Sequence, residues 1–248
     1  MTTNITLTNR FKNENKNLSW NIICDFDGTI SSVDVTDSLL MQFASAEWKQ
    51  IEQIWQDGLI GSRQCLAQQI PLLDMSLTDL NDHLDRIQID PDFPAFVAEM
   101  HKKGHRITVV SDGLDYSINR ILKRYGLDSL VIKANKLIQN GESSWSINFS
   151  HTDFKCEILS GNCKCAVVKK YQLENTKNDQ FLLIGDGASD FCVADKVNFV
   201  YAKNALIKHC LKKKIPFEPI ENFAQVLLLL SSQMPTSQPL INDRNSSD

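Results

Sequence analysis

The stretch Asn21-Ile-Ile-Cys-Asp-Phe-Asp-Gly-Thr29 decides the fold class of this chain of 248 residues. A short apolar run ends abruptly in two acidic residues and a glycine, which is typical of a buried strand followed by a turn. Three later runs look alike: Arg106-Ile-Thr-Val-Val110 ends at Ser-Asp-Gly, Phe181-Leu-Leu-Ile184 ends at Gly-Asp-Gly, and Val197-Asn-Phe-Val-Tyr201 ends at Ala-Lys-Asn. The same strand-to-turn unit therefore recurs along the chain.

Helical patterns separate these runs. Residues 94–103 carry apolar side chains on one face and are followed by Gly104, and residues 115–125 do the same with Gly126 as the stop. Strands that alternate with helices predict a doubly wound parallel sheet covered on both faces. The expected fold class is therefore α/β, with a Rossmann-like sheet.

Residues 34–90 break the alternation. The first helix predicted there has apolar residues that step by three and four until Gly58: Leu40, Phe43, Ala44, Trp48, Ile51 and Trp55. A second helix starts at Ser62 and ends at Pro71, and a third starts at Ser76 with a capping-box-like pattern. This insert is too short and too helical for another sheet layer, so we expect a small cap over one end of the sheet. Trp48 and Trp55 are either core residues of that cap or an apolar wall of a substrate pocket.

The expected domain organisation follows from these segments. Residues 20–33 and 91–231 form the core domain, and residues 34–90 form the helical cap inserted after the first strand. Residues 1–19 and 232–248 are rich in Asn, Ser and Thr and are expected to be flexible tails. Asn140-Gly141 lies between two strand-like segments, 136–138 and 144–149, and predicts a β-hairpin.

Composition excludes several classes of protein. Hydrophobic residues make up 42% and charged residues 23%, which excludes collagen-like, disordered and highly charged chains. A general nucleic-acid binder should be more basic than 26 Lys and Arg against 30 Asp and Glu, a net charge of −4. The longest apolar run, 226–230, is far shorter than the ~20 residues of a membrane span, and the first residues lack a signal peptide. We expect a cytoplasmic protein that binds neither nucleic acid nor membrane, with its oligomeric state left open.

The seven cysteines are an odd number, and without an export signal they favour free thiols in a reducing cytosol. Cys156, Cys163 and Cys165 have the spacing C-x6-C-x-C, which offers no clear fourth zinc ligand although His151 is near. We expect these thiols to be unligated and keep a zinc site as the alternative.

Acidic and hydroxyl side chains follow the predicted strands. Asp25 and Asp27 follow the first run, Ser111 the second and Asp186 the third, while Asp190 begins the next helix. Ligands of an open parallel sheet bind beyond the carboxyl ends of its strands, so these side chains should meet at one rim. Four carboxylates repel one another unless a cation neutralises them. Because the expected ligands are all oxygens, the cation should be Mg²⁺ rather than zinc.

Such a rim suits phosphoryl transfer. A carboxylate beside a metal can attack phosphorus and form an aspartyl-phosphate. A second carboxylate two residues later can protonate the leaving oxygen and later deprotonate water. A hydroxyl, backbone N–H groups and an ammonium can hold the other phosphoryl oxygens. Each motif alone is also compatible with an ordinary turn, and their conjunction favours a catalytic site.

The motifs resemble, in order and in strand context, those of the haloacid-dehalogenase-like (HAD-like) phosphatases: Asp25-Phe-Asp-Gly-Thr29, Val110-Ser-Asp-Gly113 and Gly185-Asp-Gly-Ala-Ser-Asp190. The resemblance implies that Asp25 is the nucleophile and Asp27 the general acid/base. It also implies that Mg²⁺ is held by the Asp25 carboxylate, the Asp27 backbone carbonyl and Asp186, with Asp190 in support.

The same resemblance extends to substrate binding. Ser111 would bind the phosphoryl group, and Thr29, Asp112 and Gly113 of the same motifs are the further substrate-binding candidates. Asp112 stands where Ser-Gly-Gly is more usual, so we expect its side chain to point away from the phosphate. Arg63 of the cap either grips a second anionic group of the substrate or is a solvated charge.

A helical insert after the first motif is similar to the small-cap subclass that includes phosphoserine phosphatases. That subclass has a lysine just before a helix, and Lys164 fits, whereas Lys169 and Lys170 lie inside the helix pattern and should face solvent. A looser similarity connects the Trp48 region, residues 58–63 and the Cys-rich stretch to methionine-salvage phosphatases. Those act on 2-hydroxy-3-keto-5-methylthiopentenyl-1-phosphate.

The expected function is Mg²⁺-dependent hydrolysis of a small phosphorylated metabolite by a phosphoric monoester hydrolase, with the metabolite left open. A phosphotransferase or a phosphonate-cleaving enzyme is the first alternative, but the latter needs a reactive cap lysine, and Lys49 is the only lysine between 34 and 90. A non-catalytic binding protein on this fold would be indicated by loss of Asp25 or Asp27, and both are present. A phosphorylated receiver domain would have no large helical insert.

Overall fold

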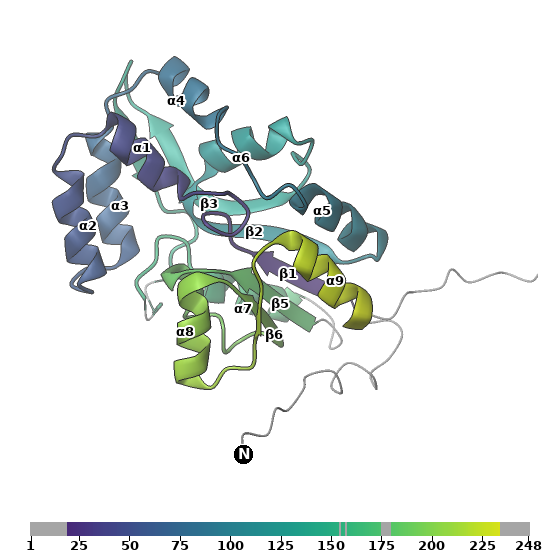
Figure 1. The fold of residues 1–248 in the computed structure, drawn as a ribbon. Helices are drawn as coiled ribbons and strands as arrows, with labels where there is room; N and C mark the ends of the chain where they lie inside the picture. Colours follow the sequence, from purple (N-terminus) through teal and green to yellow (C-terminus); the bar gives the residue numbers. More distant parts are fainter. Residues whose placement is uncertain (1–18, 154, 157, 175–179, 234–248) are drawn as a thin grey trace, which may run out of the picture.

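The computed structural model describes residues 19–153, 155–156, 158–174 and 180–233. The tails predicted for 1–19 and 232–248 lie outside these residues, except for 19, 232 and 233. The described residues form a seven-stranded sheet in the order β4-β3-β2-β1-β5-β6-β7 (Figure 1). Its strands are β1 Trp20–Cys24, β2 Arg106–Leu114, β3 Val131–Gln139, β4 Trp145–Asn148, β5 Gln180–Gly185, β6 Phe199–Ala202 and β7 Glu218–Pro219.

The strands pair in parallel, apart from the antiparallel β3–β4 hairpin, so the predicted parallel sheet and the predicted hairpin are both confirmed. β1 lies between β2 and β5. The chain builds the sheet outward from β1 to β2 and β3, then returns to the other side of β1 for β5 and β6. A crevice opens beyond the strand ends at such a reversal of strand order, here next to Cys24, the last residue of β1.

Helices cover both faces of the sheet, as the alternation of strands and helices predicts. They are α5 Phe93–Lys102, α6 Asp115–Arg124, α7 Lys164–Glu174, α8 Asn204–Lys213 and α9 Phe223–Gln233. Ile22 packs in one core cluster with Phe96 of α5, whereas its neighbour Ile23 packs in a second cluster with Val168 of α7 and Leu206 of α8. Because successive strand residues point to opposite faces, β1 is buried on both sides. No helix within the described ranges is long and apolar enough to cross a membrane.

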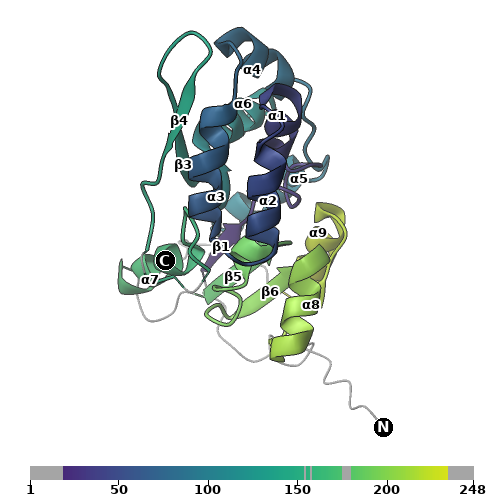
Figure 2. The ribbon, with the colours of Figure 1, turned by 90° about the vertical axis from the view of Figure 1, so that its left-hand side faces the viewer.

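The insert after β1 forms α1 Val35–Phe43, α2 Trp48–Gln56, α3 Ser62–Gln69, a 3-10 turn Ile70–Leu72 and α4 Leu77–Leu84. In Figure 2, α2 and α3 run side by side, and the β1 arrow of Figure 1 points toward the side of the molecule on which α1, α2 and α3 lie. The helical insert therefore stands over the carboxyl end of the sheet. The capping box predicted at Ser76 is present, with Asp79 as its partner.

The prediction of one helix from Leu40 to Trp55 is wrong, because the helix is interrupted between α1 and α2. Ala44 has an extended backbone (φ −94°, ψ 152°) and forms a β-bridge with Leu73. Leu40 and Trp48 nevertheless belong to the same core cluster. The apolar spacing thus persists across the break because both helices bury residues in the same core, although the backbone turns.

The second predicted strand also needs correction, because β2 does not end at Val110 but continues to Leu114. Its pairing with β3 shifts register between Val110 and Leu114. An irregularity of this kind bends a strand and re-aims its side chains. Ser111 and its two neighbours lie in this irregular stretch, beside the end of β1.

The core reaches back to the cap through its hairpin and through residues 158–161. The indole Nε1–H of Trp145 in β4 donates to the carbonyl oxygen of Met75 at 2.9 Å. The backbone N–H of Arg63 in α3 donates to the carbonyl oxygen of Leu159 at 3.3 Å. These contacts bring core segments against the cap, and the domain boundaries at 34 and 90 stay a prediction.

Candidate active site at the carboxyl end of the sheet

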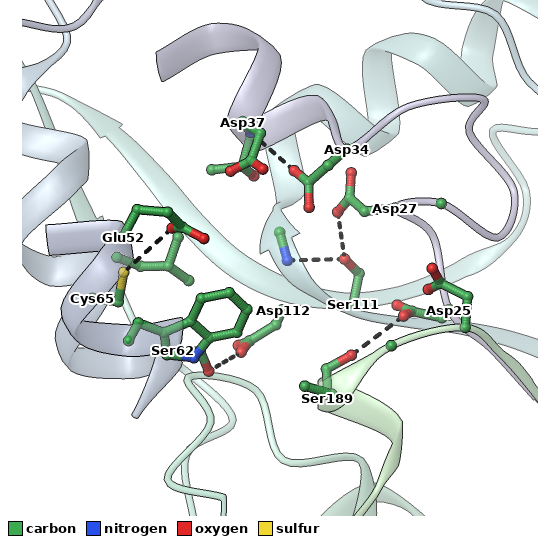
Figure 3. Close-up of a pocket in the computed structure, with 18 of the residues that line it drawn as sticks. Asp25, Asp27, Asp34, Asp37, Glu52, Ser62, Cys65, Ser111, Asp112 and Ser189 are labelled. Atoms are coloured by element: carbon green, nitrogen blue, oxygen red, sulfur yellow. Dashed lines mark hydrogen bonds between the residues drawn. The ribbon is translucent and has the colours of Figure 1, made fainter. Parts of the chain in front are cut away.

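A cavity of about 480 Å³ lies between the strand ends and the cap (Figure 3). The core side of the cavity is lined by residues of the three motifs: Asp25, Asp27, Ser111, Asp112, Gly113, Asp186 and Ser189. The cap side is lined chiefly by α1, α2 and α3. The structure therefore brings most of the predicted site residues to one place, as the strand-end argument requires.

Asp25 is held in position through both of its carboxylate oxygens. It continues the β1–β5 ladder, because its N–H donates to the Ile184 carbonyl oxygen at 2.9 Å. Its Oδ1 accepts the Phe26 N–H at 2.8 Å, and its Oδ2 accepts the Ser189 hydroxyl at 3.3 Å. Asp25 Oδ2 is also 2.9 Å from Lys164 Nζ. A carboxylate fixed in this way is oriented for attack on a bound group.

Lys164 is the first residue of α7, and its side chain is completely buried beneath the cavity. Its Nζ lies 2.6 Å from Asp190 Oδ1 and 2.7 Å from Ser189 Oγ, in addition to the contact with Asp25. Burial alone would lower the pKa of Lys164, but the carboxylates of Asp190 and Asp25 raise it above its usual value. The rival Lys170 is exposed and pairs with Glu174 along the same helix. Lys164 is thus the charged partner of the aspartate cluster.

Asp27 has a different environment from Asp25. Its Oδ1 accepts the Val35 N–H at 2.9 Å, and its Oδ2 accepts the Ser111 hydroxyl at 3.2 Å. Burial, followed by the nearby Asp34 carboxylate, raises the pKa of Asp27 well above its usual value. A Cβ at Gly113 would lie 2.5 Å from Asp27 Oδ2, so only glycine fits there. A half-buried carboxyl with a raised pKa is suited to carry a proton.

Asp186 and Asp190 are fixed by neighbouring loops. Asp186 Oδ1 accepts the Thr29 hydroxyl at 3.3 Å, and its Oδ2 accepts the Asn204 amide N–H at 3.2 Å. Asp190 Oδ2 accepts the backbone N–H groups of Asp186 at 3.0 Å and of Gly187 at 3.2 Å. Thr29 therefore supports Asp186 from behind, and it is not among the described residues that line the cavity.

The donor set fits a magnesium ion. Carboxylate oxygens of Asp25, Asp186 and Asp190 all lie within 4.8 Å of one another. Burial and the Asp25 charge raise the pKa of Asp186, and the Lys164 ammonium offsets this effect only in part. Gly28 (φ +69°) passes so close that a Cβ there would be 2.6 Å from Asp186 Oδ2. A small divalent cation with oxygen ligands would relieve this repulsion.

Asp112 lines the cavity, but protein groups occupy its carboxylate. The Ser62 hydroxyl of α3 donates to Oδ2 (Figure 3). The backbone N–H of Asn162 donates to Oδ1 at 2.8 Å. Asn135 Nδ2 also donates to Oδ1, at 3.2 Å. The departure from the usual motif at this position thus ties the cap to the core.

The cap contributes acidic residues that the sequence reasoning missed. Asp34, Asp37 and Glu52 line the cavity from α1 and α2 and face the motif residues (Figure 3). Desolvation raises the pKa of the half-buried Asp37 to about 7 and that of Asp34, which remains exposed by surface area, to about 6. Asp34 and Asp37 could have been found from sequence, because their spacing of three residues is typical of the start of a helix. No sequence pattern indicates which face of α2 lines the cavity.

The predictions for the two cap tryptophans and for Arg63 have different outcomes. Trp48 is buried in the cap core, whereas Trp55 lines the cavity, so the two alternatives apply to different tryptophans. Arg63 is not among the described residues that line the cavity, and none of those residues is a lysine, arginine or histidine. Ser189 and Asn204 were also missed, although Ser189 lies inside the third motif and Asn204 directly follows a predicted strand.

Comparison with known proteins agrees with this fold. Residues 22–195 match the haloacid dehalogenase-like hydrolase family, and the chain belongs to that family. It is 30% identical over 210 residues, 83% of this chain and 94% of the relative, to a 2-hydroxy-3-keto-5-methylthiopentenyl-1-phosphate phosphatase of Exiguobacterium sibiricum. It is 28% identical to Pdp3-interacting factor 1 of Schizosaccharomyces pombe over 83% of this chain and 92% of the relative.

Solved structures place the fold in the same group. A substrate-bound phosphoserine phosphatase superposes with a TM-score of 0.65 at 23% identity, covering 88% of this chain and 99% of that one. The expected HAD-like α/β fold and the expected class of enzyme, a phosphatase, are therefore confirmed.

Proposed function

We propose that this protein is a Mg²⁺-dependent phosphatase that hydrolyses a small phosphomonoester through an aspartyl-phosphate on Asp25. One observation carries the proposal: two aspartates two residues apart face the same cavity in opposite electrostatic environments. Asp25 is paired with the Lys164 ammonium, whereas burial and acidic neighbours raise the pKa of Asp27. An ion-paired carboxylate beside a carboxyl group with a raised pKa suits the roles of a nucleophile and an acid.

The first chemical step uses both aspartates. The Asp25 carboxylate attacks phosphorus, the bond from phosphorus to the leaving oxygen breaks, and Asp27 gives its proton to that oxygen. Ser111 Oγ is 3.2 Å from Asp27 Oδ2 and lines the cavity, so its hydroxyl would hold the phosphoryl group. Lys164, 2.9 Å from Asp25 Oδ2, keeps that carboxylate oriented.

The second step reverses the role of Asp27. It takes a proton from water, the water oxygen attacks phosphorus, and the bond from phosphorus to Asp25 breaks, which releases phosphate. The Asp25 and Asp186 carboxylates and the Asp27 carbonyl would hold Mg²⁺, with Asp190 in support. The ion neutralises the charge of the phosphoryl oxygens when bound. Uncatalysed phosphomonoester hydrolysis is slow enough that the acceleration can reach ~10²¹-fold.

The cavity lining favours a substrate without a second anionic group. Seven carboxyl groups line it and none of its described lining residues is cationic: Asp25, Asp27, Asp34, Asp37, Glu52, Asp112 and Asp186. Trp55, Leu66 and Phe191 add an apolar wall. The substrate named for the relatives, 2-hydroxy-3-keto-5-methylthiopentenyl-1-phosphate, has an uncharged carbon chain with an apolar methylthio end. It is our first candidate substrate.

The experiment is a phosphate-release assay over phosphoserine, phosphoethanolamine, pyridoxal phosphate and the methionine-salvage intermediate. Activity should require Mg²⁺, disappear in excess chelator and fall in Ca²⁺, which takes more ligands at longer distances. Asp25→Asn should lower the rate by at least about 10³-fold because an amide cannot form the acyl phosphate. Asp85→Asn, an exposed cap carboxylate paired with Arg120, is the matched control and should leave the rate unchanged.

Two results would contradict the proposal. One is full activity in chelator by protein that contains no metal. The other is an Asp25→Asn variant that retains more than about a tenth of the wild-type rate. Transfer of phosphate to an added alcohol without release to water would favour the phosphotransferase alternative.

A further inference from the structure

A second group of metal-binding side chains lies away from the phosphatase cavity. The Sγ atoms of Cys156, Cys163 and Cys192 all lie within 4.8 Å of one another, and all three residues are buried. Cys165, half-buried, joins them: its thiol interacts with those of Cys163 and Cys192, and its Sγ is 2.8 Å from the Cys192 carbonyl oxygen. We propose that Cys156, Cys163, Cys165 and Cys192 bind one structural Zn²⁺ ion.

The arrangement of the thiols suits one tetrahedral ion. Zinc–sulfur bonds of ~2.3 Å in a tetrahedron place sulfur atoms about 3.8 Å apart, and the three most buried sulfurs are already within 4.8 Å of one another. All four candidate ligands are soft sulfur atoms, which selects zinc over the magnesium proposed for the carboxylate site. The cysteines are unpaired, so no disulfide competes for these sulfurs in the structure.

The surroundings supply the charge that such a site needs. Four thiolates around Zn²⁺ carry a net charge of about −2. Lys155, Lys169 and Lys196 line the hollow of about 430 Å³ beside the thiols. Lys196 Nζ donates to the Cys192 carbonyl oxygen, which anchors one of these ammonium groups next to the sulfurs. Three lysines against one acidic residue of this lining, Asp153, would compensate part of the charge of a dianionic centre, and Lys196 also pairs with Asp195 at 3.3 Å.

The position of the cluster gives the ion a structural task. Cys163 and Cys165 flank Lys164, and Cys192 follows Asp190 by two residues. Lys164 and Asp190 form the buried 2.6 Å pair behind Asp25. One ion bound to these cysteines would fasten the start of α7 to the segment after β5. It would thereby position the Lys164–Asp190 pair from outside the cavity.

The sequence left this site open because its ligands come from distant segments. The spacing of Cys156, Cys163 and Cys165 offered no fourth ligand, and His151 was the nearest alternative. In the structure the backbone carbonyl of His151 accepts the Cys163 N–H at 3.2 Å, and its ring is not part of the thiol group. The missing sulfur belongs to Cys192, which the fold brings in from beyond the third motif.

The test measures zinc in the full-length protein, purified under reducing conditions without a chelator or a polyhistidine tag. Elemental analysis should find about one zinc per chain. Cys163→Ser and Cys192→Ser should each lower that content below about a fifth of the wild-type value. Cys210→Ser, which changes a buried cysteine of α8 outside the thiol group, should keep the full content. Zinc retained in both cluster variants would overturn the proposal.

A measurement on the unaltered chain covers the case in which the serine variants do not fold. Zinc is released with a thiol reagent, the reagent is reversed, and Co²⁺ is added; a tetrahedral thiolate site then shows sulfur-to-cobalt charge transfer and visible d–d bands. Asp186→Asn should retain zinc, which separates this site from the proposed magnesium site. Wild-type protein without zinc and without the cobalt spectrum would overturn the assignment, as would iron in place of zinc or disulfides among the four cysteines.

Discussion

The core side of the cavity, here called the floor, and its cap side, here called the roof, differ in how their carboxylates are compensated by cations. On the floor, Asp25 and Asp190 share the buried ammonium of Lys164 at 2.9 and 2.6 Å. On the roof, Asp34, Asp37 and Glu52 take part in no salt bridge among the described residues. Glu52 accepts only neutral donors there, such as the Gln69 amide at 3.0 Å. The floor thus neutralises part of its charge with one buried lysine, whereas the roof has no such cation in the described part of the chain and leaves its charges to act on whatever enters the cavity.

Removing Lys164 should have the largest effect on stability and activity. Without its ammonium, the carboxylates of the floor would lack a cation, as those of the roof do. Lys164→Ala leaves Asp25 and Asp190 buried without their cation, so we expect a loss of ~3–5 kcal/mol in the free energy of unfolding. We also expect a fall in kcat of at least about 10²-fold. Urea denaturation and steady-state kinetics with the best substrate of the panel measure both.

The control is Lys170→Ala on the same helix. Lys170 is exposed and pairs with Glu174 at 3.7 Å, so its loss should change stability by ~0.5 kcal/mol or less. If Lys164→Ala folds with wild-type stability and keeps a similar kcat, the floor is not organised around this ammonium.

The floor could be predicted from sequence because its residues occupy fixed places relative to strands. Asp25, Ser111 and Asp186 each follow a recognisable apolar run, and a parallel sheet forces such positions together. The roof could not be predicted from sequence, because which cap residues line the cavity depends on the turn between α1 and α2. The backbone leaves the helical conformation at Ala44, where no glycine or proline marks the end of the helix. Cys192 was missed for the same reason, since its partners lie in another segment.

Charge on the roof should determine which substrates are accepted. Wild-type kcat/KM should be at least about tenfold higher for phosphoethanolamine than for phosphoserine, because the extra carboxylate of phosphoserine meets like charges in a confined site. Glu52→Gln should narrow this ratio several-fold, corresponding to ~1 kcal/mol. Glu47→Gln, at the start of α2 and outside the cavity lining, should leave the ratio unchanged. Equal or better turnover of phosphoserine by the wild type would show that the roof does not select by charge.

Roof charges should also make the metal-free protein less stable as pH rises. The pKa values of Asp34 and Asp37 are raised to about 6 and about 7, so the folded state binds more protons than the unfolded state above pH ~4. Stability in chelator should therefore fall between pH ~4 and ~7, by on the order of 1 kcal/mol after solvent screening. Urea denaturation at the two ends of this range measures the change.

Two variants sharpen the pH experiment. Asp34→Asn with Asp37→Asn should reduce the pH dependence, and the remaining slope belongs to Asp27 and Asp186, whose pKa values are also raised. Asn at position 34 can still cap α1. Asp79→Asn is the control and should leave the slope between pH ~4 and ~7 unchanged, because hydrogen bonds from Ser76 lower the pKa of Asp79 and its stabilising effect is lost only below that range. A double variant with the wild-type slope would place the titrating groups elsewhere.

The most direct test of the floor chemistry is a rapid acid quench of Asp27→Asn with an aryl phosphate. The variant keeps the backbone carbonyl proposed to face Mg²⁺, and an aryl leaving group needs little help from an acid, so the first step should proceed while the second lacks its base. The account predicts a burst of about one leaving group per enzyme and a phosphate attached to Asp25 in the quenched peptide. Equal slowing of aryl and alkyl substrates in a folded, Mg²⁺-binding variant, with no phosphate on Asp25, would contradict it.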